Sequence, residues 1–195
     1  MGPQVEHAGC ITTGLVSEDK STVPLSRYRR EFRLLLIIAA LVVTLDQLSK
    51  LWIRANLSPA SQLELLPGFL DLVLVRNYGA AFGLLPHQTG LIIAVSIAGL
   101  LIMSLFLHRF PPANTLGITS FALIVGGTAG NLVDRFRPPH YVTDFIRVHL
   151  HPLFSWPAFN IADAAMIVGI LALIYYFHRS GVFRKAYERT HRPKD

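Results

Sequence analysis

The residues in this sequence that could do chemistry are carboxylates set in otherwise apolar surroundings. Asp144 and Asp163 are the candidates for a catalytic pair, because neither has a cation on its own face in sequence. Arg147 is close to Asp144, but in an extended strand it would point to the opposite face. Two close carboxylates share one proton near neutral pH, so the ionised one can activate water and the protonated one can stabilise an oxyanion. This chemistry needs no metal and no other cofactor.

Two further aspartates differ because each has a basic neighbour. Lys50 lies one helical turn after Asp46, and Arg135 follows Asp134 directly. Asn131 lies one turn before Asp134 and Arg135, so these three residues can brace one another. The cations favour ionised carboxylates that hold structure or substrate. For Asp46 and Lys50, a structural role and a catalytic role both stay open.

Other catalytic classes fit the sequence poorly. Cys10 is the only cysteine and lies in the polar segment at the start of the chain, so neither an internal disulfide nor a cysteine enzyme is expected. A serine triad lacks a G-x-S-x-G motif. His140, His149 and His151 are close in sequence, but the H-E-x-x-H spacing of a zinc site is missing. We therefore expect no metal.

Four apolar segments must position these polar residues. The chain is 52% hydrophobic and 15% charged, whereas a soluble domain is about 25% charged. Each segment is near the ~20 residues that cross a ~30 Å hydrocarbon core, and none shows charges at helical period. The sequence predicts an all-α membrane protein whose four transmembrane helices span about residues 34–53, 91–107, 116–133 and 159–177.

The polar residues on these segments fall in one layer of the membrane. Asp46 lies about 18 Å along the first span, Asn131 and Asp134 lie at the far end of the third, and Asn160 and Asp163 lie in the first turn of the fourth. Four spans place both termini on one side, which carries twelve of the 18 Lys and Arg residues. The positive-inside rule puts both termini in the cytoplasm and the polar layer near the outer face. The net charge of +6 is then a topology signal and does not indicate nucleic-acid binding.

The segments outside the spans divide the chain into three parts. We predict a disordered cytoplasmic extension over 1–28, a four-helix transmembrane domain over 29–178 and a basic cytoplasmic tail over 179–195. Residues 69–75 and 141–148 have strand character, which predicts a small β-rich element at the outer interface.

Gly126 and Gly130 form a G-x-x-x-G pattern in the third span. Small residues at this spacing let helix backbones approach closely. We favour packing within the chain over a self-dimerisation face.

Five sequence blocks resemble those of the lipoprotein signal peptidases (signal peptidase II, aspartic peptidase family A8), in the same order and on corresponding segments. The resemblance covers about residues 33–178. The blocks are Asp46-Gln47-x-x-Lys50, Asn77-x-Gly79-Ala80-Ala81-Phe82, Gly126-Gly127-x-x-Gly130-Asn131-x-x-Asp134-Arg135, Val142-x-Asp144-Phe145 and Phe159-Asn160-x-Ala162-Asp163.

The resemblance implies a membrane aspartic endopeptidase of the bacterial cytoplasmic (inner) membrane. Such enzymes remove signal peptides from prolipoproteins by cutting before the diacylglyceryl-modified cysteine, and globomycin-type peptides inhibit them. The implied catalytic dyad is Asp144 and Asp163, and the implied partners are diacylated prolipoproteins and membrane lipid. Positions that would shape the site or bind substrate are Asp46, Lys50, Asn77, Gly79, Asn131, Asp134, Arg135 and Asn160.

The chain departs from the family pattern at two places. Arg137-Pro138-Pro139-His140 stands in a stretch where members often carry a glycine, and Thr143 stands where a second valine is common. A small transporter or proton pathway is the rival reading, since intramembrane Asp, Asn and Lys mark those proteins too. Transporters bind near the midplane, often between inverted repeats. A polar layer at one face without a visible repeat favours the hydrolase.

Overall fold

The structure is a computed structural model that describes residues 25–79, 88–109, 112, 114–151 and 154–181 of the 195-residue chain. All four predicted spans are helices, and each is long and apolar enough to cross a membrane. The helices are α1 (Leu25–Asn56), α2 (Thr89–Arg109), α3 (Thr115–Phe136) and α4 (Ile161–Ser180).

All four helices differ from the predicted spans by a few residues or more at their ends, and the starts of α1 and α4 need correction. α1 begins at Leu25, so residues 25–28, which we assigned to the disordered extension, are helical. α4 begins at Ile161, two residues later than expected. The apolar run of the fourth segment starts at Phe159, but that residue ends a strand, and the Asn160 side chain then caps the helix. Hydropathy alone did not distinguish the end of the strand from the start of the helix.

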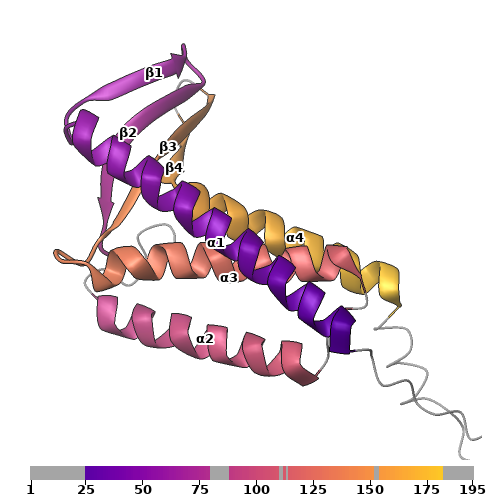
Figure 1. Ribbon diagram of the computed structural model, residues 1–195. Helices are drawn as coiled ribbons and strands as arrows, with labels where there is room; N and C mark the ends of the chain where they lie inside the picture. Colours follow the sequence, from indigo (N-terminus) through magenta and orange to yellow (C-terminus); the bar gives the residue numbers. More distant parts are fainter. Residues whose placement is uncertain (1–24, 80–87, 110–111, 113, 152–153, 182–195) are drawn as a thin grey trace, which may run out of the picture.

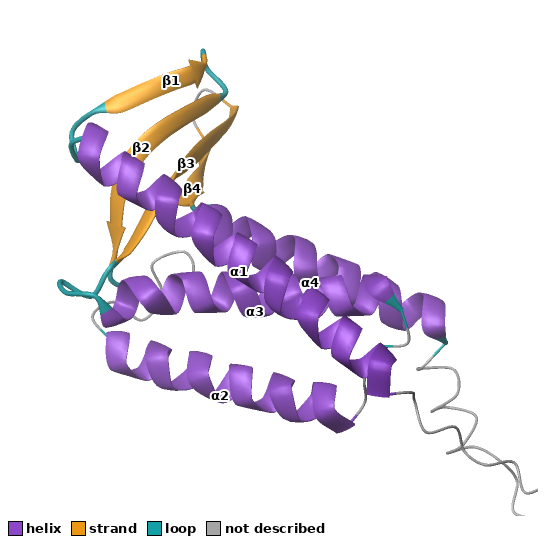
Figure 2. Cartoon of the chain, viewed as in Figure 1, coloured by secondary structure: helices purple, strands orange, loops and turns teal. Residues whose placement is uncertain are grey.

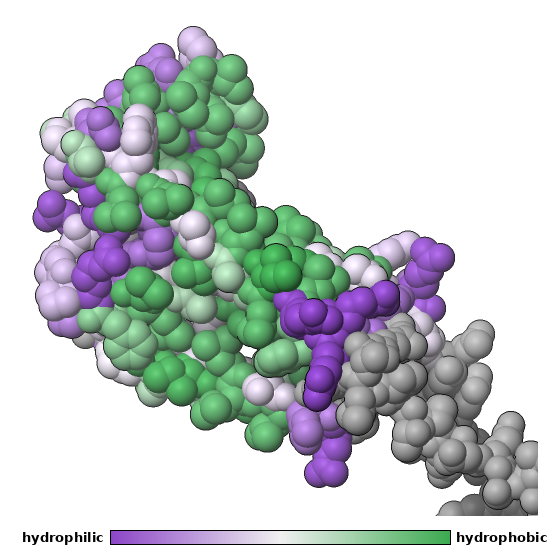
Figure 3. Space-filling view, viewed as in Figure 1, coloured by the Kyte–Doolittle hydropathy of each residue, from purple (hydrophilic) through white to green (hydrophobic). Residues whose placement is uncertain are grey.

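Helix α3 is the centre of the bundle. It packs against α1 and α4 and also against α2, which lies on its far side (Figure 1). In the most apolar 18-residue stretch of α3, 61% of the residues are buried, whereas none are buried in that of α2. Exposed side chains on α2, such as Val95, Ile102 and Leu105, would face lipid. In the space-filling view, apolar residues cover much of the helical part (Figure 3).

Glycines on α3 let its neighbours approach closely. A Cβ on Gly126 would lie 2.9 Å from Ala39 O of α1, and a Cβ on Gly127 would collide with Ala162 O of α4. At Gly130 the space is occupied by the carboxylate of Asp46. The interpretation of the G-x-x-x-G pattern as packing within the chain is therefore confirmed.

One end of the bundle carries a four-stranded antiparallel sheet in the order β1-β2-β3-β4 (Figure 2). Strands β2 (Leu70–Asn77) and β3 (Val142–His151) confirm the two predicted extended segments. Strands β1 (Gln62–Leu66) and β4 (Phe154–Phe159) were not predicted. β1 is exposed along its whole length, so its leucines bury no apolar face. β4 contains Pro157, which only an edge strand tolerates readily.

The sheet rests on the end of α1. Ile53 of α1, Leu74 of β2 and Phe145 of β3 form a buried apolar cluster between them. The start of α1 and the end of α4 lie at the opposite end of the bundle (Figure 1). The fold therefore has two distinct ends, and the one with the sheet holds the polar layer described below.

The first prediction concerns orientation. Because the chain crosses an even number of times and its basic residues favour the terminal side, we expect the sheet to lie outside and both termini to lie in the cytoplasm. In a Cys10→Ser background, an impermeant maleimide added to intact cells should label Gln62→Cys, on exposed β1, but not Thr190→Cys. Labelling of Thr190→Cys without permeabilisation would reverse this topology.

The second prediction concerns the α3–α4 contact. Gly127→Ala should lower the free energy of unfolding of the detergent-solubilised protein by about 1–3 kcal/mol, because its Cβ would overlap the backbone of α4. Its thermal midpoint should fall accordingly. Gly90→Ala is the matched control, since a Cβ there meets nothing within 4 Å. Equal midpoints for the two variants would contradict the packing argument.

Candidate active site

Asp144 lies near the start of β3 and is only 4% exposed. Its Oδ2 accepts a hydrogen bond from Asn77 Nδ2 at 2.9 Å, and its Oδ1 accepts one from Asn160 Nδ2 at 2.7 Å. Asn77 ends β2, and Asn160 is the N-cap of α4. Elements from both halves of the chain thus fix one carboxylate.

Asp163 lies in the first turn of α4 and forms a capping box with Asn160. The Asn160 side chain accepts from Asp163 N at 2.9 Å, and Asp163 Oδ2 accepts from Asn160 N at 3.2 Å. The other oxygen, Oδ1, accepts from Asn131 Nδ2 at 2.8 Å. These hydrogen bonds hold both carboxylate oxygens of Asp163 in place at the start of α4.

A pair of asparagines joins the two aspartates. Asn160 Nδ2 donates to Asn131 Oδ1 at 3.1 Å as well as to Asp144, and Asn131 donates to Asp163. This amide chain fixes the orientation of both carboxamides. Asp144 and Asp163 are thereby tied to one hydrogen-bond network, although they lie on a strand and on a helix.

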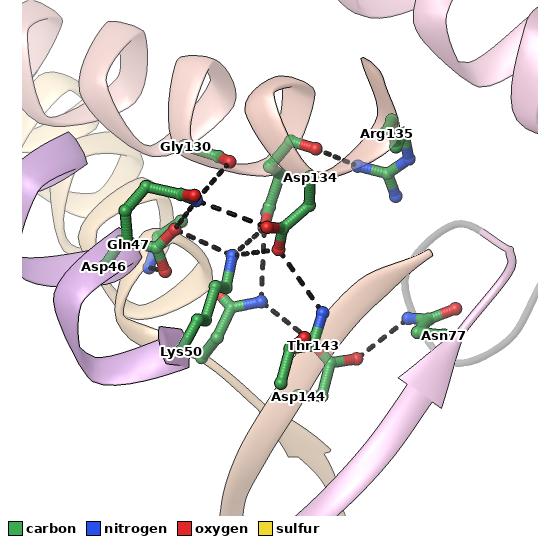
Figure 4. A network of polar contacts seen from close by, with 12 residues as sticks. Asp46, Gln47, Lys50, Asn77, Gly130, Asp134, Arg135, Thr143 and Asp144 are labelled. Atoms are coloured by element: carbon green, nitrogen blue, oxygen red, sulfur yellow. Dashed lines mark hydrogen bonds and ion pairs between the residues drawn. The ribbon is translucent and has the colours of Figure 1, made fainter. Parts of the chain in front are cut away.

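A second network lies behind this pair, around Lys50 (Figure 4). Lys50 Nζ contacts Asp46 Oδ2 at 2.7 Å, Asp134 Oδ2 at 2.9 Å and Asn131 Oδ1 at 3.0 Å. Lys50 and Asp46 are both 0% exposed. Asp46 Oδ1 also accepts from Ala162 N of α4 at 3.0 Å. The predicted Asp46–Lys50 pair is present, and its burial behind the asparagines favours the structural role.

Arg135 connects the site to the loop that follows β2. Its Nη2 donates to Gly79 O at 3.0 Å, and its Nη1 donates to Asn131 O at 3.3 Å. Gly79 N in turn donates to Asn77 Oδ1 at 2.9 Å. Of the block that begins at Asn77, residues 80–82 lie outside the described residues.

A cavity of about 750 Å³ opens in front of the aspartates. Its polar wall includes Asn77, Asn131, Arg135, Asp144 and Asp163, and most of the remaining wall is apolar. α2 and α4 both supply side chains to this wall. A second described cavity, of about 440 Å³ between α1, α2 and α3, has Glu31 as its one carboxylate. The larger cavity is the one suited to carboxylate chemistry.

The pKa of Asp144 is raised to about 7, mainly because burial disfavours the charged form. The negative charge of Asp163 raises it further. The hydrogen bonds from Asn77 and Asn160 and the charge of Lys50 lower it, but by less. Arg135 is the other cation whose charge acts on Asp144 and Asp163. Asp144 can therefore hold or release a proton near neutral pH.

Two expectations about local charge need correction. Asp134 pairs with Lys50 at 2.9 Å and with Arg54 at 3.5 Å. The adjacent Arg135 donates instead to the backbone carbonyls of Asn131 and Gly79. Asp144 and Asp163 do have partners, but these are neutral amides and a backbone N–H group.

Sequence reasoning missed Arg54 and the side-chain role of Gln47. Gln47 Nε2 donates to Asp46 Oδ2, Gly130 O and Asp134 Oδ1 at 3.1–3.4 Å. A signal for Arg54 was present, because it lies one turn beyond Lys50 and two turns beyond Asp46 on the same side of the helix. The histidines take other contacts: His149 Nε2 lies 2.7 Å from Asp71 Oδ2, and His140 Nδ1 lies 2.9 Å from Arg135 O.

Comparisons with known proteins agree with this arrangement. Residues 38–179 match the profile of the peptidase A8 family, described as signal peptidase (SPase) II. The chain is 40% identical over 159 residues to a lipoprotein signal peptidase of Syntrophotalea carbinolica, covering 80% of this chain and 98% of the relative. It is 37% identical over 160 residues to that of Pseudomonas aeruginosa, covering 79% and 91%.

Solved structures show the same fold. A bacterial membrane enzyme solved by the in meso method at 2.3 Å resolution superposes with a TM-score of 0.67 and is 25% identical, covering 83% of this chain and 92% of that one. A second, at 1.9 Å resolution, gives a TM-score of 0.65 at 29% identity, covering 72% and 90%.

The third prediction follows from the raised pKa of Asp144. The pKa is 3.8 in an unfolded chain and about 7 here, so between these values the folded state keeps a proton that the unfolded state has released. The free energy of unfolding should therefore fall as pH rises from about 4 to about 7, by ~4 kcal/mol at ~1.36 kcal/mol per pKa unit. Unfolding in mixed micelles at several pH values measures it. Asp144→Asn should flatten this fall, and Glu64→Gln, on exposed β1, should not.

Proposed function

This chain belongs to the lipoprotein signal peptidase (signal peptidase II) family, and on that premise we propose that Asp144 and Asp163 carry out its peptide cleavage. As a member, it is a multi-pass protease of the bacterial inner membrane that removes signal peptides from prolipoproteins. The observation that carries the proposal is the asparagine-linked aspartate pair facing one cavity.

The aspartic mechanism uses one proton shared by the pair. Asp144 is the more buried carboxylate, with a pKa raised to about 7, so we assign the shared proton to it. Asp163, with donors on both oxygens, is then the ionised member. Asp163 takes a proton from water as the water oxygen attacks the scissile carbonyl, and Asp144 donates a hydrogen bond to the developing oxyanion. The proton that Asp163 took from water then passes to the nitrogen of the leaving amine as the C–N bond breaks, which returns Asp163 to its ionised form and leaves Asp144 protonated.

The cavity suits a substrate that carries lipid. Its floor is polar at the aspartates, while α2 and α4 present apolar side chains such as Ile92, Met103 and Ile170. A diacylglyceryl-modified prolipoprotein could enter sideways from the outer leaflet and keep its acyl chains in lipid. Globomycin-type peptides would occupy the same cavity. Asn77 and Arg135 would bind or shape the peptide, because they line the cavity near Asp144. Gly79 would help to shape the site, because it hydrogen-bonds to both of them.

The proposed domain organisation places catalysis in residues 29–178. Both tails, 1–28 and 179–195, lie outside the family match for most of their length. With the sheet at the outer face, the aspartate pair would lie at the outer membrane–water interface and the termini in the cytoplasm.

The fourth prediction separates the four aspartates by function. Asp144→Asn and Asp163→Asn should each abolish turnover, by at least about 10³-fold, while the protein folds and still binds a globomycin-type inhibitor. Asp46→Asn and Asp134→Asn should lower stability or binding but leave measurable turnover, because their carboxylates pair with Lys50 behind the cavity. A gel-shift assay of a diacylated prolipoprotein with purified enzyme measures this.

The matched control is Asp71→Asn, which removes a buried carboxylate of β2 that pairs with His149. It should keep turnover per folded molecule. If Asp163→Asn kept near-normal turnover while Asp46→Asn lost all of it, the dyad would be wrongly assigned.

A further inference from the structure

Gly99 is the one glycine in the interior of a described helix that packing within the chain does not explain. It lies midway along α2, where glycine favours the helix less than alanine does. A Cβ on Gly99 would meet nothing within 4 Å. The other glycines beyond the first two residues of a described helix would each bring a Cβ to less than 3.0 Å from another atom, and they are Gly117, Gly126, Gly127, Gly130 and Gly169. Whatever fills the space beside Gly99 must come from outside the described residues.

Gly99 borders the cavity that contains the aspartate pair. It lines the same space as Asp144 and Asp163. The lining of α2 begins at Ile92 and ends at Met103, eleven residues later, which is a distance of about 16 Å at ~1.5 Å per residue. Because Gly99 lies within this stretch, its missing side chain widens the apolar part of the cavity.

Three phenylalanines join α2 to its neighbours at the inner end of this cavity. The ring of Phe106 lies 5.8 Å from that of Phe121 on α3 and 6.3 Å from that of Phe177 on α4, measured between centroids. Phe106 and Phe121 lie one helical turn deeper than Met103 and Ile124, which are the deepest lining residues of α2 and α3. The cavity therefore extends over about half of a ~30 Å hydrocarbon core and ends at this aromatic contact.

The length, polarity and width of this space fit the apolar segment of a signal peptide. Such a segment has about 7–15 residues and precedes the cleavage site, so as a helix it would extend about 10–22 Å away from the aspartates. A glycine on the wall lets a second helix backbone approach closely. A helix with its side chains is about 10 Å across and much wider than a single acyl chain, so it is the occupant that needs the extra space.

Resting on the proposed function, we infer that Gly99 is a specificity-determining residue that leaves room for the apolar helix of the signal peptide between α2 and α4. The contact of Phe106 with its two aromatic neighbours ends the space available to this helix. The peptide bond before the modified cysteine then lies at Asp144 and Asp163, and the acyl chains stay in lipid. The size of the side chain at position 99 controls which signal peptides are accepted and leaves the aspartates unchanged.

The test compares Gly99→Leu with Gly90→Leu in the full-length protein. Both glycines have open space for a Cβ, but of the two only Gly99 lines the cavity. Gly99→Leu should keep or raise the thermal midpoint, because leucine favours a helix more than glycine does. It should lower kcat/KM for a diacylated prolipoprotein about 10- to 100-fold, because the added side chain occupies the place of the substrate. Gly90→Leu should leave kcat/KM close to that of the wild type.

Substrate variants identify what the new side chain displaces, each compared with its cleavage by the wild type. Replacing leucines of the signal peptide's apolar segment with alanine should restore cleavage by Gly99→Leu, whereas shortening the acyl chains should not. Unchanged kcat/KM, recovery with shorter acyl chains, or a loss that neither change relieves would overturn the inference. If Gly99→Leu does not fold, Gly99→Ala gives the same reading with phenylalanine placed in the apolar segment. Turnover by Asp144→Asn, or no cleavage by the wild type, would instead overturn the proposed function.

Discussion

The fully buried ammonium group of Lys50 is the constraint on which the polar end of the molecule depends. A charge removed from solvent is tolerated only when oxygen atoms surround it, and removing one partner of such a pair is strongly destabilising. Lys50 obtains its oxygens from Asp46 on its own helix and from Asn131 and Asp134 on α3. α1 and α3 can therefore associate in one register only. Asp46 extends the constraint to α4 through Ala162 N, and Asp134 extends it to β3 through Thr143 N.

Charge balance divides the four aspartates into two pairs with different properties. Asp46 and Asp134 have two cations in direct contact, Lys50 and Arg54, so each carboxylate has a basic side chain as its partner. Asp144 and Asp163 have amide donors as direct partners, and the charge of Arg135 acts on them from the cavity wall. When the carboxylates of Asp144 and Asp163 share one proton, their combined charge is balanced by the single charge of Arg135. The arrangement therefore favours the half-protonated state that the proposed mechanism needs, while the contacts with Lys50 and Arg54 hold the first pair in place.

Sequence patterns were sufficient where one residue's environment is set by its own segment. Span length and hydropathy predicted all four helices, and alternation predicted β2 and β3. Helical spacing predicted the contact of Asp46 with Lys50. The polar layer followed from depth, since Asn131, Asn160 and Asp163 fall at span ends. The spacing of glycines predicted close packing, although it could not say which helix faces Gly126 and which faces Gly127.

The failures have a common physical cause, which is that tertiary partners override sequence neighbours. Arg135 adjoins Asp134 in sequence, but neighbouring residues on a helix point in different directions, so each finds its partners elsewhere. β1 buries none of its residues and β4 contains Pro157, and each strand pairs with an edge that β2 or β3 offers. Asn131 and Asn160, which join Asp144 to Asp163, lie on α3 and at the start of α4 and share no spacing rule. In a membrane this outcome is expected, because lipid supplies no hydrogen bonds and each polar group must find its partner within the protein. The residues that such a network needs are fixed by where elements meet, and the sequence of one element does not contain that information.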